Sequence, residues 1–261
     1  MSFPVTRHSL IQRLAQGGGE ADWQEFLDDY WGAVCRFARR SGNLSAEDSE
    51  DVAAQTFDTI LRGQLLERWT ATRTAKLRTL LCAVVRNILS NRFRLENNRS
   101  RLVREHGGQL ERYEYPDAID DPPTSEQQDG FYAAWADELL HTAVEGLMEE
   151  YRRTARADYF RVLYGRLCEQ MTMPEIAQSL KISLSAVENY FRHARARLTE
   201  SLQALVRKNA QRYAAESEVR DEFEIEWGRL GAHLQRDGGL ENAVRTAVLE
   251  APSTVRRVQS R

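Results

Sequence analysis

Cysteine, proline and glycine are all scarce in this sequence, and it has no long apolar run. The three cysteines, Cys35, Cys82 and Cys168, are far apart and odd in number, which argues against a disulfide framework and for a reducing compartment. The longest apolar runs, such as residues 80–85, are far short of the roughly 20 residues that a membrane span needs. Residues 1–20 carry charges instead of the apolar core of a signal peptide. We therefore expect a soluble, cytoplasmic protein with no membrane partner.

Residue patterns typical of catalytic and metal sites are also missing. The five histidines are isolated, without a HExxH motif or a Cys/His cluster. No Walker, GxGxxG or GxSxG loop occurs, and Gly17 to Gly19 are interpreted as a helix breaker. The carboxylates of residues 47–51 could hold a cation for a nucleic-acid-processing enzyme, but they lack ligand spacing, so a solvated or partner-binding helix face is preferred. We predict no catalytic residue, no metal, no cofactor and no enzymatic activity.

The few prolines and glycines leave room for long helices, and the apolar residues recur at steps of three and four. This spacing, with 42% apolar residues, predicts an all-α protein. Helices are expected over about residues 9–16, 21–40, 45–61 and 74–94. In the third of these, Ser45 followed by Asp48 offers an N-cap, and the inward residues are Val52, Phe57, Ile60 and Leu61.

Apolar periodicity fades between residues 96 and 130, where the charge changes from basic to acidic. We interpret this segment as a flexible linker. It separates a first helical domain, residues 1–95, from a second, residues 131–208, in which periodicity resumes at Trp135. Residues 209–261 have a separate amphipathic period and are expected to form a helical C-terminal extension.

A helix-turn-helix unit is predicted within the second domain. Thr172 and Glu175 form a capping box around Pro174, which is tolerated in a first helical turn. The short helix ends near Leu180, residues 181–183 make a turn, and Ser183 can cap a longer helix. The expected core is Ile176, Ala177, Leu180, Ile182 and Val187. The expected outward residues, which could enter a major groove, are Leu184, Ser185, Glu188, Asn189, Arg192 and Arg195.

The charge distribution points to nucleic acid even though the net charge is only -3. Residues 86–104 contain six arginines against Glu96, and residues 181–212 contain seven basic residues against Glu188 and Glu200. Both regions therefore have an excess of five positive charges, which matches the electrostatic footprint of phosphate binding. The alternative is that these residues form the solvated faces of amphipathic helices.

Two stretches of this sequence resemble the extracytoplasmic-function (ECF) group of bacterial sigma factors, the promoter-recognition subunits of RNA polymerase. EDSEDVAAQTFDTIL (47–61) and KLRTLLCAVVRNILSNRFR (76–94) are similar to the second conserved region of that family. MTMPEIAQSLKISLSAVENYFRHARARL (171–198) is similar to its fourth region, and TRHSLIQRL (6–14) to the start of one subgroup. The resemblance covers roughly residues 5–205.

The resemblance implies two partners, core RNA polymerase and promoter DNA, and allows an anti-sigma protein as a third. By likeness to the family, the surface that docks on the polymerase would include Glu50, Asp51, Gln55, Thr56 and Phe57. The helix of residues 76–94 would engage the downstream promoter element through Arg78, Arg86, Asn87, Asn91, Arg92 and Arg94. The upstream element would be read by Ser185, Glu188, Asn189, Arg192 and Arg195. Trp69, expected in a loop, is either a base-stacking residue or a core residue.

Four positions depart from the family pattern. Ala54 replaces a glutamine on the docking helix, Leu80 a tryptophan, Glu188 a basic residue, and Lys181 the glycine of the turn, where a left-handed conformation is often needed. The preferred function is a sigma factor that directs polymerase to promoters. Because Ala54 removes a polar contact, the alternative is a helix-turn-helix DNA-binding regulator that lacks productive polymerase docking.

The extension beyond residue 208 lies outside the resemblance. Residues 216–226 contain six acidic residues against Arg220, and an apolar stripe runs through Phe223, Trp227, Leu230 and Leu234. An isolated amphipathic helix of this length is marginal in water, so we expect the stripe to pack on the preceding domains. The extension either masks the DNA-binding face or is a stabilising layer.

Overall fold

The computed structural model describes residues 10–62, 65–72, 76–105, 122–214 and 216–250, which are helical except for short turns and contain no strand. Their contacts divide the chain into two compact units, residues 1–135 and 136–261. The all-α prediction is confirmed.

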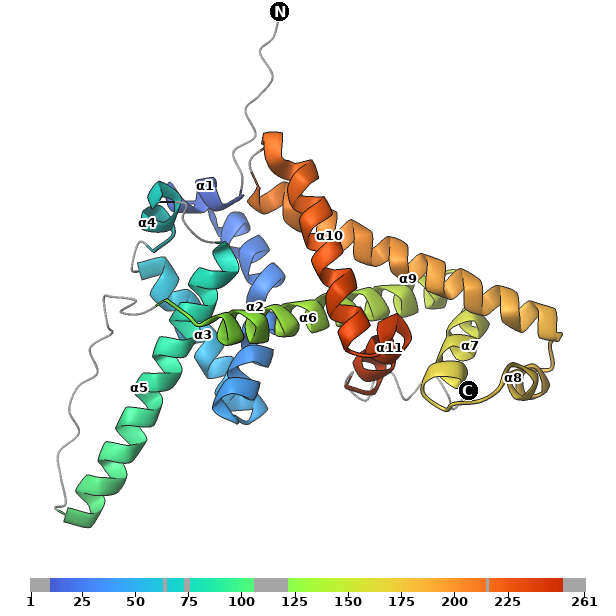
Figure 1. Cartoon of the computed structure of the whole chain (residues 1–261), viewed down its shortest axis with the longest axis horizontal. Helices are drawn as coiled ribbons and strands as arrows, with labels where there is room; N and C mark the ends of the chain where they lie inside the picture. Colours follow the sequence, from blue (N-terminus) through green and yellow to red (C-terminus); the bar gives the residue numbers. More distant parts are fainter. Residues whose placement is uncertain (1–9, 63–64, 73–75, 106–121, 215, 251–261) are drawn as a thin grey trace, which may run out of the picture. The chain divides into compact units, whose positions relative to one another are not determined.

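The first unit begins with α1 (Leu10–Ala15), α2 (Glu20–Gly42) and α3 (Ala46–Arg62). Gly17 has a φ of 90°, which confirms that the glycine run interrupts the helix. α4 (Leu65–Thr72) and α5 (Leu77–Glu105) follow. α2 packs against both α3 and α5 (Figure 1). The aromatic rings of Phe26, Tyr30 and Phe37 lie in the buried core of this unit.

Helix α6 (Ser125–Arg153) spans the division between the two units. Since α5 continues to Glu105 and α6 begins at Ser125, the expected linker of residues 96–130 is helical at both ends, which corrects that interpretation. A polar sequence can continue a helix without an apolar stripe, because the intrinsic helix propensity of its residues favours the helix even where apolar periodicity is missing. Residues 106–121 lie outside the described residues.

The second unit continues with α7 (Ala157–Leu167), α8 (Met173–Leu180) and α9 (Leu184–Tyr213). A 3-10 turn (Glu216–Glu218) leads to α10 (Val219–Arg236), and α11 (Gly239–Glu250) follows. α9 packs against α7, α8 and α10, and α11 packs against α7 (Figure 1). The extension packs back on the preceding helices of the second unit, as expected: α10 packs on α9 and α11 on α7. Leu230 and Leu234 of the apolar stripe of α10 are buried.

Candidate functional site

The acidic end of α3 forms the first candidate surface. Ser45 caps this helix: its hydroxyl accepts the Asp48 backbone N–H at 3.1 Å and donates to the Asp48 carboxylate at 2.6 Å, as predicted. Glu50 and Asp51 are exposed, and Gln55 is half-buried. A surface with two carboxylates and one amide is therefore available to a partner.

Thr56 and Phe57 do not belong to that surface, which corrects the roles that the family resemblance implied. Thr56 is fully buried, and its hydroxyl donates to the backbone oxygen of Val52 at 2.7 Å. The Phe57 ring is 5% exposed and meets the ring of Phe26 edge-on at 5.5 Å. Helical periodicity correctly placed Phe57 inward, although Leu61, assigned inward with it, is exposed.

Trp31 is a surface residue that the sequence reasoning missed. Its ring stacks on Phe57 at 5.8 Å with an interplanar angle of 14°, and its side chain is 36% exposed. A large, partly exposed aromatic ring beside a charged helix is typical of an interface anchor. The available signal was its position one residue beyond the core residue Tyr30, which turns it away from the apolar stripe of α2.

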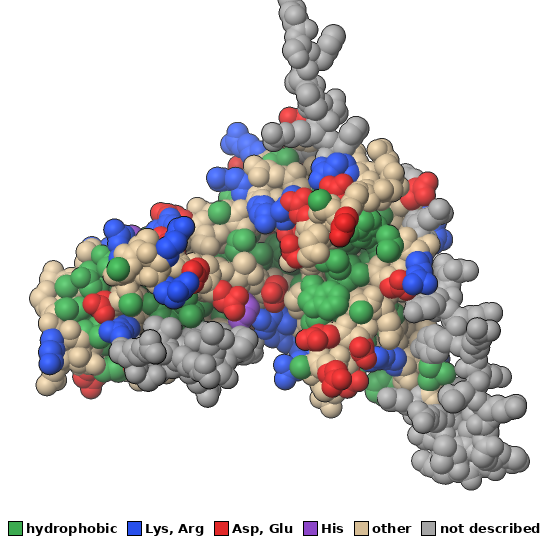
Figure 2. All heavy atoms as spheres, turned by 180° about the vertical axis from the view of Figure 1, so that it is seen from behind, with side chains coloured by type: hydrophobic (Ala, Val, Ile, Leu, Met, Phe, Trp, Pro, Cys, Tyr) green, Lys and Arg blue, Asp and Glu red, His purple; other side chains and the backbone are tan. Residues whose placement is uncertain are grey.

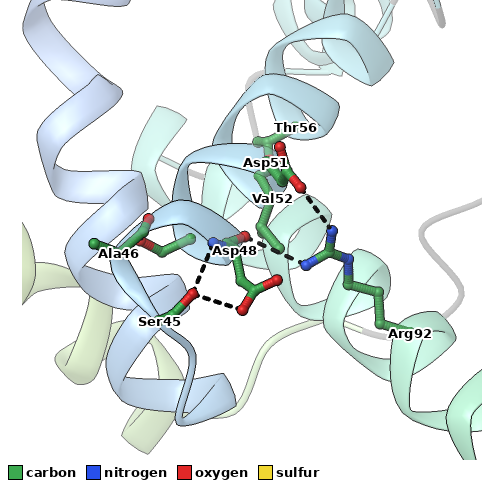
Figure 3. Close-up of polar contacts among 8 residues, drawn as sticks. Ser45, Ala46, Asp48, Asp51, Val52, Thr56 and Arg92 are labelled. Carbon is green, nitrogen blue, oxygen red and sulfur yellow. Dashed lines mark hydrogen bonds and ion pairs between the residues drawn. The ribbon is translucent and has the colours of Figure 1, made fainter.

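Arg92 of α5 contacts α3 at the same acidic end (Figure 3). Its guanidinium lies 3.6 Å from the Asp51 carboxylate and donates to the backbone oxygen of Asp48 at 3.3 Å. The predicted DNA-binding residue Arg92 and the predicted polymerase-binding residue Asp51 are therefore partners in one ion pair.

The other predicted DNA-binding residues of α5 lie in different environments. Arg78 is buried, with its guanidinium 4.2 Å from the Trp135 ring and 5.3 Å from the Tyr132 ring. This burial corrects its assignment as a DNA contact, since the side chain joins α5 to α6 within the first unit. Arg86 donates to the side-chain oxygen of Gln127 at 3.2 Å. Asn87 and Asn91 are half-buried, and Arg94 is exposed.

Trp69 lies in α4 and is half-buried. The expectation of a loop at this position is therefore wrong. A base-stacking role stays a prediction.

The helix-turn-helix forms as its local signals predicted. The Thr172 and Glu175 side chains make a reciprocal capping box at the start of α8, and the Ser183 hydroxyl accepts the Ala186 N–H at 3.1 Å at the start of α9. The hydrogen bonds from Thr172 lower the pKa of the Glu175 carboxyl. Lys181 adopts the left-handed conformation, with a φ of 56° and a ψ of 40°, which is strained for a residue that has a Cβ.

The core of the helix-turn-helix is small. Ile176 and Val187 are buried together with Val162 of α7, and the predicted Ala177, Leu180 and Ile182 pack around them. Sequence reasoning missed Val162, because α7 precedes the motif and contributes only through tertiary contact. The core therefore fixes α8 and α9 against α7.

The outward residues of α9 form the second candidate surface. Ser185, Glu188, Asn189, Arg192 and Arg195 are all exposed, as expected for a recognition helix. A shallow depression is lined by the following residues, which come from α8 and α9: Met173, Glu188, Phe191, Arg192, Arg195, Ala196 and Thr199.

Arg195 is the most engaged residue of this surface. Its guanidinium lies 5.9 Å from the centre of the Phe191 ring and 3.5 Å from the carboxylate of Glu241 in α11. Both partners of the ion pair are about half exposed. The C-terminal extension thus reaches a residue that is predicted to contact DNA.

Arg197 connects α9 to α6 within the second unit. It donates to the two carboxylate oxygens of Glu150 at 3.2 Å and 2.7 Å, and also to Glu200. The hydrogen bonds from Arg197 lower the pKa of the Glu150 carboxyl. This two-point contact orients the middle of the recognition helix. It also pairs Arg197 with a carboxylate, so that this basic side chain does not simply face solvent.

Acidic and basic side chains are interspersed over the face shown in Figure 2, in keeping with the small net charge. Among the residues that the structure describes, no three His, Cys, Asp or Glu side chains gather as metal ligands would. Within the same residues, every helix is too short or too polar to cross a membrane.

A family model described as "ECF sigma factor" matches residues 7–204. The match contains both candidate surfaces and ends before the acidic extension. A search of curated proteins finds no match, and neither does a search of solved structures.

Proposed function

Because the chain belongs to the ECF sigma factor family, whose members act in transcription initiation, we propose that it directs RNA polymerase to specific promoters. In this proposal the α3 surface docks on core polymerase, and α5 and α9 contact promoter DNA. Residues 1–95 carry polymerase docking and the downstream element, residues 131–208 carry the upstream element, and an anti-sigma protein could bind the same surfaces. The protein has no chemistry of its own in this role.

One observation carries the proposal: a single chain presents both an exposed acidic helix end and a recognition helix with exposed polar residues. Glu50 and Asp51 suit a basic partner, and Asn189 and Arg192 suit base edges and phosphates. A regulator that only binds DNA needs the second surface alone. The pairing of the two favours a factor that brings polymerase to a DNA site.

A DNA-binding regulator without productive docking is the second candidate. Ala54 is exposed on α3, and the burial of Thr56 and Phe57 makes the polar part of the docking surface smaller than the family resemblance implied. Run-off transcription on genomic fragments with purified core polymerase separates the two functions. Promoter-specific transcripts that depend on the added protein support a sigma factor, whereas DNA binding without transcripts supports the regulator.

The docking assignment is best tested at Glu50. Charge reversal of Asp51 would also break its ion pair with Arg92, so a loss of binding there has two explanations. Glu50→Lys changes an exposed residue and should leave stability within about 0.5 kcal/mol, while it weakens co-purification with core polymerase. Glu67→Lys, an equal charge change at an exposed position of α4, is the control. Normal co-purification of Glu50→Lys would refute the assignment.

The recognition surface is tested by two substitutions that have different expected signatures. Arg192→Ala should weaken all DNA sequences alike and lower the salt slope of binding by about one, while Asn189→Ala should relax the preference at one base pair. Salt titrations on a transcribed promoter and on random DNA measure both effects. Equal losses on both DNAs with unchanged slopes would show that α9 does not read the groove.

A further inference from the structure

The C-terminal extension places a carboxylate on the recognition helix. Leu184, Glu188, Arg192 and Arg195 follow one another at steps of four, four and three residues, so they lie on one face of α9. Glu241 of α11 contacts the last of them at 3.5 Å. A carboxylate beside an arginine competes with a DNA phosphate for the same guanidinium group.

The position of Glu241 is fixed by packing. α10 lies along α9, with the Arg207 guanidinium 4.9 Å from the Phe223 ring. The chain then turns at Gly238 and Gly239, whose φ angles are 87° and 88°, and the Asn242 side chain donates to the Asp237 backbone oxygen at 2.6 Å.

α11 in turn packs on α7, with Val244, Ala247 and Val248 buried. The first turn of α11, which carries Glu241, is thereby held against α7 and within reach of Arg195 in α9.

We infer that the extension is an intramolecular competitor of DNA, in which Glu241 holds Arg195 in place of a promoter phosphate. This inference rests on the proposed function, because it needs α9 to bind DNA. The two roles expected for the extension are then not alternatives: α10 and the apolar side of α11 are a structural layer, and that layer carries the masking carboxylate. Since the pair is half exposed, phosphate can displace Glu241 without unfolding the extension.

The size of the effect follows from the exposure of the pair. Exposed ion pairs contribute little, so release of Arg195 should tighten binding only about two- to five-fold. Removal of the whole extension is a poor test, because α10 packs on α9, where Leu202, Val206 and Ala210 are buried. Loss of α10 would expose this apolar surface and invite aggregation. Full-length point variants avoid this.

The experiment measures the affinity of full-length variants for a random-sequence DNA duplex, since phosphate contact does not depend on sequence. Glu241→Gln should bind about two- to five-fold tighter than the original protein. Glu218→Gln makes the same charge change at the opposite end of α10, about 27 Å away along an 18-residue helix, and should not tighten binding as much. Arg195→Ala should weaken binding, and Glu241→Gln should then bring no gain.

Equal affinities of Glu241→Gln and Glu218→Gln would overturn the inference, and so would a gain that persists without Arg195. The proposed function fails in a different way. If α9 does not bind DNA, Arg195→Ala and Arg192→Ala both leave affinity unchanged. If the chain is not a sigma factor, promoter-specific transcripts are missing whatever residue stands at position 241.

Discussion

The small core of the helix-turn-helix makes Ile176→Ala a sensitive test of how the recognition helix is held. Ile176 is 2% exposed and packs with Val162 and Val187. Loss of a buried isoleucine side chain typically costs about 2 to 5 kcal/mol. The half-buried Met171 and Met173 around this core are flexible enough to fill part of the space, so we expect about 2 to 3 kcal/mol.

The assay has to be local, because a chain with two compact units need not unfold in one step. Hydrogen exchange of peptides from residues 157–200 should become roughly 30- to 140-fold faster in Ile176→Ala, since each 1.4 kcal/mol is a factor of ten. Peptides of α2 and α3 should not change. Ser179→Ala, on the exposed side of α8, should shift the free energy of local unfolding by no more than about 0.5 kcal/mol.

Gly165 offers a rescue that tests the contact itself. A Cβ at this position would lie 3.4 Å from Cγ1 of Ile176 and 3.6 Å from the Met171 sulfur. Gly165→Ala should therefore recover about 1 kcal/mol in the Ile176→Ala background, where the methyl group enters vacated space, and less in the original protein. Equal gains in both backgrounds, or exchange in Ile176→Ala no faster than in Ser179→Ala, would refute the packing argument.

Three further predictions concern two helical glycines, the thiol of Cys82 and the hydroxyl of Tyr151. Gly42→Ala should destabilise the first unit, because its Cβ would lie 2.9 Å from Leu44 and Leu89 side chains, whereas Gly146→Ala, with open space around it, should stabilise its helix by about 0.5 to 1 kcal/mol in chemical denaturation. Burial raises the pKa of the Cys82 thiol from 9.0 to about 11, so alkylation at pH 8 should be about 100-fold slower than for an ordinary thiol; fast modification of the folded chain would contradict this. Burial and the Glu150 charge raise the pKa of Tyr151 from 10.0 to about 12, so the unfolded state loses this proton first and the free energy of unfolding should fall between about pH 10 and pH 12. Tyr151→Phe should remove that fall and, because the buried hydroxyl has no hydrogen-bond partner among the described residues, should not lower stability at pH 7.

Local signals account for what the sequence predicted well. The capping box of Thr172 and Glu175 and the cap at Ser183 are contacts between residues three apart, so the pattern alone locates both helix starts. Turn geometry at Lys181 follows in the same way. The periodicity of α10 also predicted a stripe that needs cover, because an amphipathic helix of that length is not stable alone.

Tertiary contacts account for what the sequence did not predict. Arg78 sits on the polar side of α5 by pattern, but two rings of α6 that lie more than fifty residues later bury it. The family resemblance places Thr56 and Phe57 on a surface, but both are buried, and the Trp31 ring covers Phe57. The ion pair of Arg195 and Glu241 joins residues 46 positions apart. The basic run of residues 181–212 does not show which carboxylate pairs with each arginine.

The anchoring of Arg78 between Tyr132 and Trp135 has a consequence for how this chain can be divided. A gene fragment that ends at residue 95, or anywhere before α6, would strip the aromatic cover from an arginine and leave its charge on an apolar surface. It would also remove Phe131, whose ring meets Phe37 at 5.2 Å. Expression of the N-terminal half, or its exchange between related proteins, therefore requires a boundary beyond Trp135. Such a boundary lies inside the continuous helix α6 and past the charged segment of residues 96–130, where composition alone would divide the chain.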